Sequence, residues 1–234
     1  FQETDILGMT FATVKHSYAV FDTKDIASTM SEAFAIAEHG RPGPVLVDIT
    51  KDAMQMSADY VPVPRPTIAS GHKLPKSNFK QQLQQLEKLL SDPTTKPVVI
   101  VGHGVTLGNA SEDVKRFVER HHLPMVNTLL GTGTIPLSHP LALSMLGMHG
   151  EAAANYVVHE ANVVIGIGIR FDDRITGNLD TFKQGKHFVH IEIDPSEVNK
   201  NVPNLLTFYG NVGDTLKRIN TELRQEHRFN AWWE

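Results

Sequence analysis

Residues 163–178 read VVIGIGIRFDDRITGN, and this stretch changes from apolar to charged within one residue. Its first part is a continuous run of Val, Ile and Gly, which is typical of a strand buried on both faces in a parallel sheet. The run leads directly into Arg170-Phe171-Asp172-Asp173-Arg174, four charges in five residues. Ligands bind beyond the carboxyl ends of strands in open α/β sheets, so the stretch predicts a ligand-binding edge. A solvated turn whose charges pair with one another is the alternative interpretation.

Similar strands and helices alternate along the rest of the chain. Helical spacing of apolar residues predicts helices over 26–37, 79–90 and 212–223, together with one that bears Val114, Phe117 and Val118 and one in 151–158. Ser77 is a suitable N-cap for the second of these helices, and Gly40 follows the first. Apolar runs predict strands within 45–49, 96–102, 123–129, 161–168, 187–194 and 205–210. This alternation predicts an α/β fold with a doubly wound parallel sheet.

A proline-rich stretch divides the chain into two α/β parts. We expect residues 1–52 to be the C-terminal part of one α/β domain and 53–76 to be a linker. Residues 77–225 would form a complete second domain, and 226–234 the start of a linker to a further domain. Both ends indicate a chain cut from a longer protein.

Composition excludes several classes of function. The 234 residues are 41% hydrophobic and 21% charged, as in an ordinary globular protein. A net charge of -4 argues against a nucleic-acid or membrane-surface protein, and no apolar run is long enough to span a membrane. Cysteine is absent, and the spacing of the twelve histidines predicts no metal site. Gly-x-Ser-x-Gly, P-loop and HExxH motifs are also absent.

Polar and glycine residues follow most of the predicted strands of the second part. Gly102-His103-Gly104 is either a phosphate-binding loop or a simple chain reversal, because the third glycine of a dinucleotide motif is missing. Glu192 could accept ribose hydroxyls or form a surface ion pair, and its distance from the first glycine makes plain NAD binding doubtful. The amides of residues 146–150 could hold an anion before the helix in 151–158, or Gly150 could simply begin that helix.

Four segments carry a resemblance to a known family: GRPGPVLVDITKD (40–52), LGMHG (146–150), IRFDDRITGNLDTF (169–182) and HIEIDPSEVNKN (190–201). Together they resemble the catalytic subunits of acetolactate synthases (acetohydroxyacid synthases), which are thiamine-diphosphate enzymes. RPGPV-x-VD is shared across thiamine-diphosphate enzymes, whereas LGMHG combined with RFDDR-x-TG is far more specific. The resemblance implies that 1–52 ends a pyrimidine-binding domain and that 77–225 is the middle, FAD-binding domain.

The resemblance also implies a set of site residues. Residues expected to contact FAD are Arg65, Gly102, Gly104, Thr128, Leu129, Leu146, Gly147, Met148, His149, Gly168, Ile169, Arg170, Phe171, Asp172, Glu192, Ile193, Asn211 and Val212. Phe1, Gln2, Asp173 and Arg174 would line the substrate channel, and Gln2 would border the active site. No catalytic residue and no metal ligand is expected within the chain.

The implied reaction is the condensation of pyruvate with a second 2-ketoacid in branched-chain amino-acid biosynthesis. FAD, thiamine diphosphate and Mg²⁺ are the implied cofactors, and the 234 residues alone are expected to be inactive. The implied partners are 2-ketoacids, further copies in a homo-oligomer and a regulatory subunit, in the cytoplasm of a bacterium or in a eukaryotic plastid or mitochondrion. Two alternatives stay open: a free-standing FAD- or nucleotide-binding module, and the middle domain of another thiamine-diphosphate enzyme.

Overall fold

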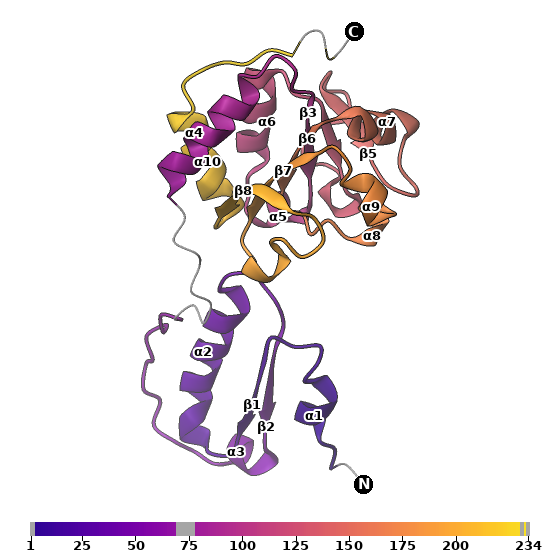
Figure 1. Ribbon diagram of the computed structural model, residues 1–234. Coiled ribbons are helices and arrows are strands. Elements are labelled where there is room, and N and C mark those ends of the chain that lie inside the picture. The colour runs from indigo at the N-terminus through magenta and orange to yellow at the C-terminus, as the bar shows by residue number, and fades with distance from the viewer. Residues whose placement is uncertain (1–2, 69–77, 230–231, 233–234) are drawn as a thin grey trace. The chain divides into compact units, whose positions relative to one another are not determined.

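The computed structural model describes residues 3–68, 78–229 and 232 (Figure 1). Phe1, Gln2 and Ser77 therefore lie outside the described residues. The chain forms two compact units, 1–73 and 74–234, and each is described by itself below.

The first unit is a small α/β layer. Strands β1 (His16–Val20) and β2 (Val45–Ile49) pair in parallel, and helix α2 (Ile26–Glu38) connects them. Helices α1 (Ile6–Thr10) and α3 (Lys51–Gln55) and a 3-10 turn, η1 (Thr23–Asp25), complete it. The structure thus confirms the helix predicted over 26–37, as α2, and the strand predicted within 45–49, as β2. Strand β1 was not predicted. Large apolar side chains in this unit are exposed, among them Phe11 and Phe34.

The second unit contains a six-stranded parallel sheet. Its strands are β3 (Pro97–Val101), β4 (Met125–Asn127), β5 (Ala142–Met145), β6 (Val163–Ile167), β7 (His187–Glu192) and β8 (Asn204–Tyr209). They are ordered β5-β4-β3-β6-β7-β8, and each pairs in parallel with its neighbours. Numbered within the unit, this is the order 3-2-1-4-5-6 of doubly wound dinucleotide-binding folds. The predicted fold class is confirmed, and the direction of winding reverses between β3 and β6.

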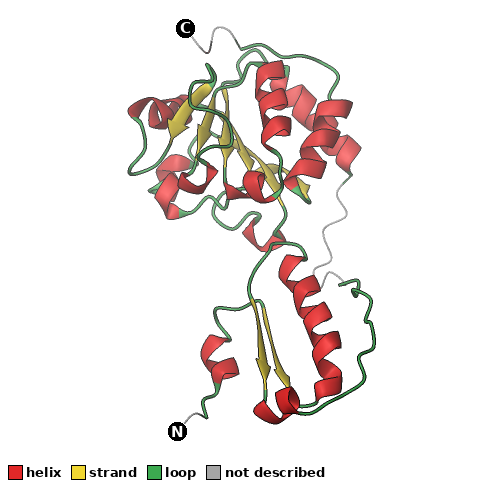
Figure 2. Cartoon of the chain, turned by 180° about the vertical axis from the view of Figure 1, so that it is seen from behind, coloured by secondary structure: helices red, strands yellow, loops and turns green. Residues whose placement is uncertain are grey.

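Helices cover both faces of this sheet (Figures 1 and 2). Alternate residues of β3 belong to different cores, because successive side chains of a strand point to opposite faces. Val99 and Val101 pack with α4 (Phe79–Leu90), α6 (Ser111–His121) and α10 (Val212–Glu222). Val98 and Ile100 pack in a second core with α7 (Ala152–Glu160) and, at its edge, α9 (Leu179–Phe182). Short elements at the ends of strands complete the unit: α5 (His103–Leu107), η2 (Leu129–Gly131), α8 (Asp173–Thr176) and η3 (Pro195–Glu197).

Two local features differ from the sequence-based expectation. Asn78 is the N-cap of α4, where its side chain accepts a hydrogen bond from the amide of Gln81; the expected cap was Ser77. Beyond α10, Phe229 belongs to the core of the second unit, and the indole Nε1–H of Trp232 donates to the carbonyl of Pro97 at 3.0 Å. Part of the stretch expected to begin a linker therefore packs against the amino end of β3.

Candidate functional site at the carboxyl edge of the sheet

Three glycines bring the ends of β3 and β6 together at the point where the winding reverses. A Cβ atom on Gly102 would overlap the carbonyl oxygen of Gly168, and one on Gly104 would lie 2.6 Å from the Cα of Gly168. Gly168 itself has φ +60°, a conformation that favours glycine. The amides of Gly102 and Gly104 donate to the carbonyls of Ile167 and Gly168 at 3.0 and 3.1 Å. These glycines therefore serve the close approach of two backbones and add no side chain of their own at the switch point.

The turn that follows β6 alternates between the core and the surface. Ile169 and Phe171 are buried in the second core, whereas Arg170 is exposed and Asp172 partly so. The ring of Phe171 lies against Gly166, where a Cβ atom would come within 2.5 Å of its Cζ. The glycine inside the apolar strand thus makes room for this ring. A ligand contact from Ile169 or Phe171 would have to come from the backbone.

The charges at the end of β6 form an ion pair at the edge of the sheet. Nη2 of Arg170 lies 3.0 Å from Oδ2 of Asp172, and the two side chains are 53% and 39% exposed. Asp173 and Arg174 begin α8 and are exposed. The internal pairing considered from the sequence is present, and it leaves the guanidinium of Arg170 half accessible at the strand end.

The LGMHG segment spans the edge of the sheet from β5 toward β6. Gly147 has φ +105°, and a Cβ atom there would overlap the carbonyl oxygen of Arg174 in α8. The side chain of Asn155, in α7, accepts from the amide of Gly147 at 2.9 Å and donates to its carbonyl at 3.1 Å. The amides of Leu146 and Gly150 donate to the carbonyls of Asn127 and Gly147. Three of the five amides that could have held an anion are therefore bonded within the protein.

Exposed apolar side chains gather at the ends of β4 and β5. Leu129 and Leu130, in η2, are 72% and 64% exposed, and Met148 is 71% exposed. Thr128 caps η2, since its Oγ1 accepts from the amide of Gly131 at 3.2 Å, and His149 is exposed. Apolar groups and a cation at the same edge of the sheet suit a ligand with an aromatic and an anionic part.

Four further predicted residues lie at the ends of β7 and β8: Glu192, Ile193, Asn211 and Val212. Glu192 is buried, and its Oε1 accepts from the amides of Ile193 and Asp194, both at 3.0 Å. Asn211 is the N-cap of α10 and accepts from the amide of Gly213 at 2.8 Å, while Val212 is buried in the first core. At the ends of β7 and β8, a ligand would therefore meet mainly backbone groups of Ile193, Asn211 and Val212.

Three predicted residues are not part of the described second unit. Arg65 belongs to the first unit, where its Nη2 lies 2.6 Å from Oε2 of Glu38. Phe1 and Gln2 fall outside the described residues. The other predicted FAD contacts lie in the second unit, where Glu192 ends β7 and the rest follow strands β3 to β8.

Sequence reasoning missed several residues that shape the edge. Asn155 fixes the Gly147 loop, and Asn201 donates to the carbonyl of Phe171 at 2.9 Å. Only the lone glycine at 166, within an otherwise β-branched strand, carried a sequence signal, because such a glycine often marks a close approach.

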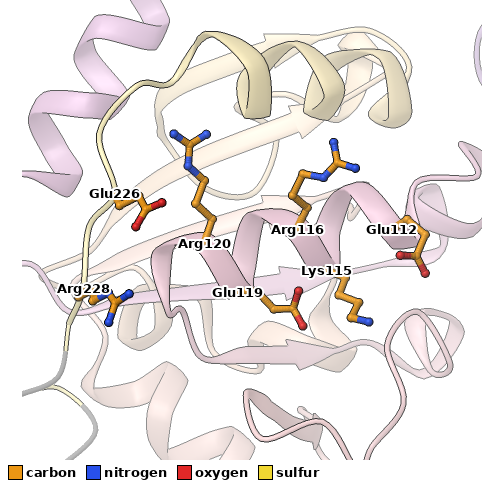
Figure 3. A pocket seen from close by; sticks show the side chains of 7 residues that line it. All are labelled: Glu112, Lys115, Arg116, Glu119, Arg120, Glu226 and Arg228. Atoms are coloured by element: carbon orange, nitrogen blue, oxygen red, sulfur yellow. The ribbon is translucent and has the colours of Figure 1, made fainter.

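A shallow pocket lies elsewhere in the second unit, over α6 and the segment after α10 (Figure 3). Its lining is Glu112, Lys115, Arg116, Glu119, Arg120, Glu226 and Arg228. Arg120 donates to the carbonyls of Asn220 and Arg224 at 2.8 and 3.1 Å, so its charge already serves the end of α10. The charges of both signs and the open shape are those of a solvated helix face, and the carboxyl edge carries the stronger case for a ligand.

The described part of the chain, 3–68, 78–229 and 232, shows neither a metal site nor a membrane span. Within it, no group of three His, Asp or Glu side chains is placed to hold a metal ion. None of its helices has both the length and the apolar character needed to cross a membrane.

Comparison with known proteins shows which family this chain resembles. Residues 83–219 match the model of the thiamine pyrophosphate enzyme central domain. The chain is 41% identical over 238 residues to the acetolactate synthase large subunit of Parasynechococcus marenigrum, covering 100% of this chain and 38% of that protein. Identity to acetolactate synthase 1, chloroplastic, of Zea mays is 40% over 240 residues, covering 99% and 37%. For the large subunit of Haemophilus influenzae the figures are 38% over 240 residues, covering 100% and 42%.

The chain thus spans about two fifths of the length of the curated relatives it matches. The family match covers more than half of its residues and coincides with the six-stranded sheet and its helices. The chain therefore belongs to the thiamine pyrophosphate enzymes, and its second unit contains their central domain.

Proposed function

We propose that the second unit binds FAD along the carboxyl edge of its sheet and that the chain forms this part of an acetolactate synthase. The observation that carries the proposal is the meeting of Gly102, Gly104 and Gly168 at the switch point, with Arg170 beside them. Dinucleotides bind at such a switch point in doubly wound sheets. The relatives with 38% to 41% identity, all named acetolactate synthases, support the wider assignment.

The residues at the edge fit the three parts of FAD. Gly102, Gly104 and Gly168 carry no side chains that would keep a pyrophosphate away from the backbone. The half-exposed guanidinium of Arg170 suits the pyrophosphate oxygens through charge-assisted hydrogen bonds. Leu129, Leu130 and Met148 are exposed to water, and they would pack against the aromatic ring system of the flavin. Backbone groups after β7 and β8 would meet the adenosine end.

In the complete enzyme, we propose, thiamine diphosphate with Mg²⁺ would supply the chemistry by which pyruvate loses CO2 and its remaining two-carbon unit joins a second 2-ketoacid. This reaction involves no net oxidation or reduction, so FAD would have a structural role. The residues described above would bind and orient the flavin nucleotide, and none of them is assigned a proton transfer. We also propose that 1–52 and 77–225 are separate domains of this enzyme. The enzyme would assemble as a homo-oligomer and bind a regulatory subunit.

The alternatives are less well supported. A free-standing nucleotide-binding module would not be expected to share identity with acetolactate synthases over the first unit as well as the second, as this chain does. The middle domain of a different thiamine-diphosphate enzyme is disfavoured because every relative named above is an acetolactate synthase.

Replacing Arg170 with alanine tests the proposal. If the guanidinium meets the flavin nucleotide, FAD affinity should fall by about tenfold or more, because a charged hydrogen bond contributes roughly 1.5–3 kcal/mol. The stability of the FAD-free chain should change little, since an exposed ion pair contributes about 0–1 kcal/mol. Calorimetric titration of FAD and melting curves of the FAD-free proteins measure the two effects.

Arg218→Ala is the matched control. Arg218 is also 53% exposed and paired with a carboxylate, Glu222, at 2.6 Å, but it lies in α10 away from the strand ends. Its replacement should leave FAD affinity unchanged. Equal affinities for Arg170→Ala and the wild type would remove Arg170 from the site.

A further inference from the structure

The turn after β6 needs an anchor to keep its conformation. Phe171 has φ +49°, which is rare for a bulky residue and costs about 1–3 kcal/mol unless its surroundings hold it in place. The carbonyls of Ile169, Arg170 and Phe171 all accept hydrogen bonds from side chains of the protein. Two of these bonds come from Asn201, a partly buried residue, and the third comes from a fully buried histidine.

That histidine is His190, in the middle of β7. Its side chain is 0% exposed, and its Nε2–H donates to the carbonyl of Ile169 at 2.7 Å. Its Nδ1 accepts from Nδ2 of Asn204, in β8, at 3.3 Å. The first contact requires a proton on Nε2, and the second is made when Nδ1 is unprotonated, as in the neutral Nε2–H tautomer. A hydrogen-bonded chain therefore runs from β8 through β7 to the turn after β6, and the ring of Phe171 packs edge-on against the imidazole.

The hydrogen bond from His190 decides which way the next peptide group faces. In a trans peptide the carbonyl and the following N–H point in opposite directions. Because the carbonyl of Ile169 points at buried His190, the N–H of Arg170 points away from it. Rotation of this peptide would redirect the amide of Arg170.

We infer that His190 is a positioning residue for the ligand edge, which holds the 169–170 peptide so that the amide of Arg170 faces a bound nucleotide. The inference rests on the proposed binding of FAD but concerns a residue that would not touch it. His190 lies on the same face of β7 as Phe188, which belongs to the second core, and it acts on Arg170 through its hydrogen bond to Ile169.

The groups around His190 define its response to pH. Burial lowers the pKa of His190, while its bond to Ile169 and the carboxylate of Glu197 act in the opposite direction. Oε2 of Glu192 lies 3.7 Å from its Nε2, and Glu197 is itself paired with Lys200. Protonation would add an N–H at Nδ1 but would keep the Nε2–H that donates to Ile169. The anchoring bond is therefore expected to persist on acidification.

Two substitutions separate positioning from simple packing. His190→Gln keeps an N–H donor near the position of Nε2 but cannot be protonated, whereas His190→Leu keeps the volume and loses the donor. His187→Gln is the matched control, because His187 lies in the same strand and is exposed. FAD affinity is measured by calorimetry at pH 7.5, with melting curves to confirm that each variant is folded.

At pH 7.5 we expect His190→Leu to bind FAD about tenfold more weakly than the wild type and His190→Gln to bind within about threefold of it. His187→Gln should bind FAD as the wild type does. A folded His190→Leu with wild-type affinity, or a His190→Gln that binds FAD as weakly as His190→Leu, would overturn the inference.

A second readout keeps the inference apart from the proposed function. Hydrogen exchange of residues 169–173 in the FAD-free chain reports on the turn itself. His190→Leu should accelerate this exchange and His190→Gln should not. If the wild type failed to bind FAD, the proposed function would fail, and equal exchange in all variants would separately refute the anchoring by His190.

Discussion

Phe171→Ala should lower the free energy of unfolding of the second unit by about 3–5 kcal/mol, the usual cost of removing a fully buried phenylalanine. The side chain is 1% exposed and contacts the rings of Phe188 and Phe182, with centroids 5.5 and 6.5 Å away. Gly166 has no side chain that could fill the space. Denaturant unfolding followed by tryptophan fluorescence measures the loss in this unit alone, because both tryptophans, at 232 and 233, belong to it.

Leu205→Ala provides the comparison for Phe171→Ala. Leu205 also lies in the second unit, in β8, but it is 53% exposed, so its loss should change the unfolding free energy by no more than about 0.5 kcal/mol. A loss below about 1 kcal/mol for Phe171→Ala would show that the turn is not built around this ring.

Acidification from pH 7 to pH 4 should destabilise the second unit through a buried pair of histidines. His121, the last residue of α6, stacks on His227 at a centroid distance of 5.6 Å. The Nε2 atom of each is buried without a hydrogen-bond partner in the described part of the chain. Burial, then His227 and Arg120, lower the pKa of His121 to about 4, and burial also lowers the pKa of His227.

The sign of the effect follows from the direction of the shift. Because the pKa of His121 is lower in the folded chain than in the unfolded chain, the unfolded chain binds more protons at acid pH. Stability is therefore lost as the pH falls from about 6.5 toward 4, by about 3 kcal/mol for His121 alone.

Unfolding of His121→Leu and of the wild type at both pH values measures this loss. His121→Leu should lose about 3 kcal/mol less than the wild type over this range. His159→Leu, which removes an exposed histidine of α7, should follow the wild type. Parallel losses in the wild type and His121→Leu would exclude the buried pair as the cause.

Long regular elements could be predicted from the sequence because their apolar periodicity is strong. The stripe of Val212, Leu216, Ile219 and Leu223 marks α10 and its last turn, and all four side chains are buried. β5 (Ala142–Met145) escaped prediction because it is a short strand at the edge of the sheet, only partly buried, and carries Ser144 at φ +71°. β1 is likewise a partly exposed strand of mixed composition.

The site could be predicted only where the chain itself carries the pattern. Glycine or polar residues after most of the predicted strands located the carboxyl edge, since parallel strands end on one side. The partners that fix the edge come from distant parts of the chain, such as Asn155 for Gly147 and His190 for Ile169. Nothing in the residues around Arg170 indicates which buried side chain its turn will meet.

Hydrogen exchange of the chain with and without FAD tests the central proposal most directly, because it detects binding and locates it in one measurement. We predict slower exchange in 102–104, 128–131, 146–149 and 168–172, the segments that follow β3, β4, β5 and β6. Exchange in α6 and in 223–229, around the pocket of Figure 3, should stay unchanged. Absence of any protection at saturating FAD, or protection confined to α6, would contradict the proposal that the carboxyl edge holds the flavin.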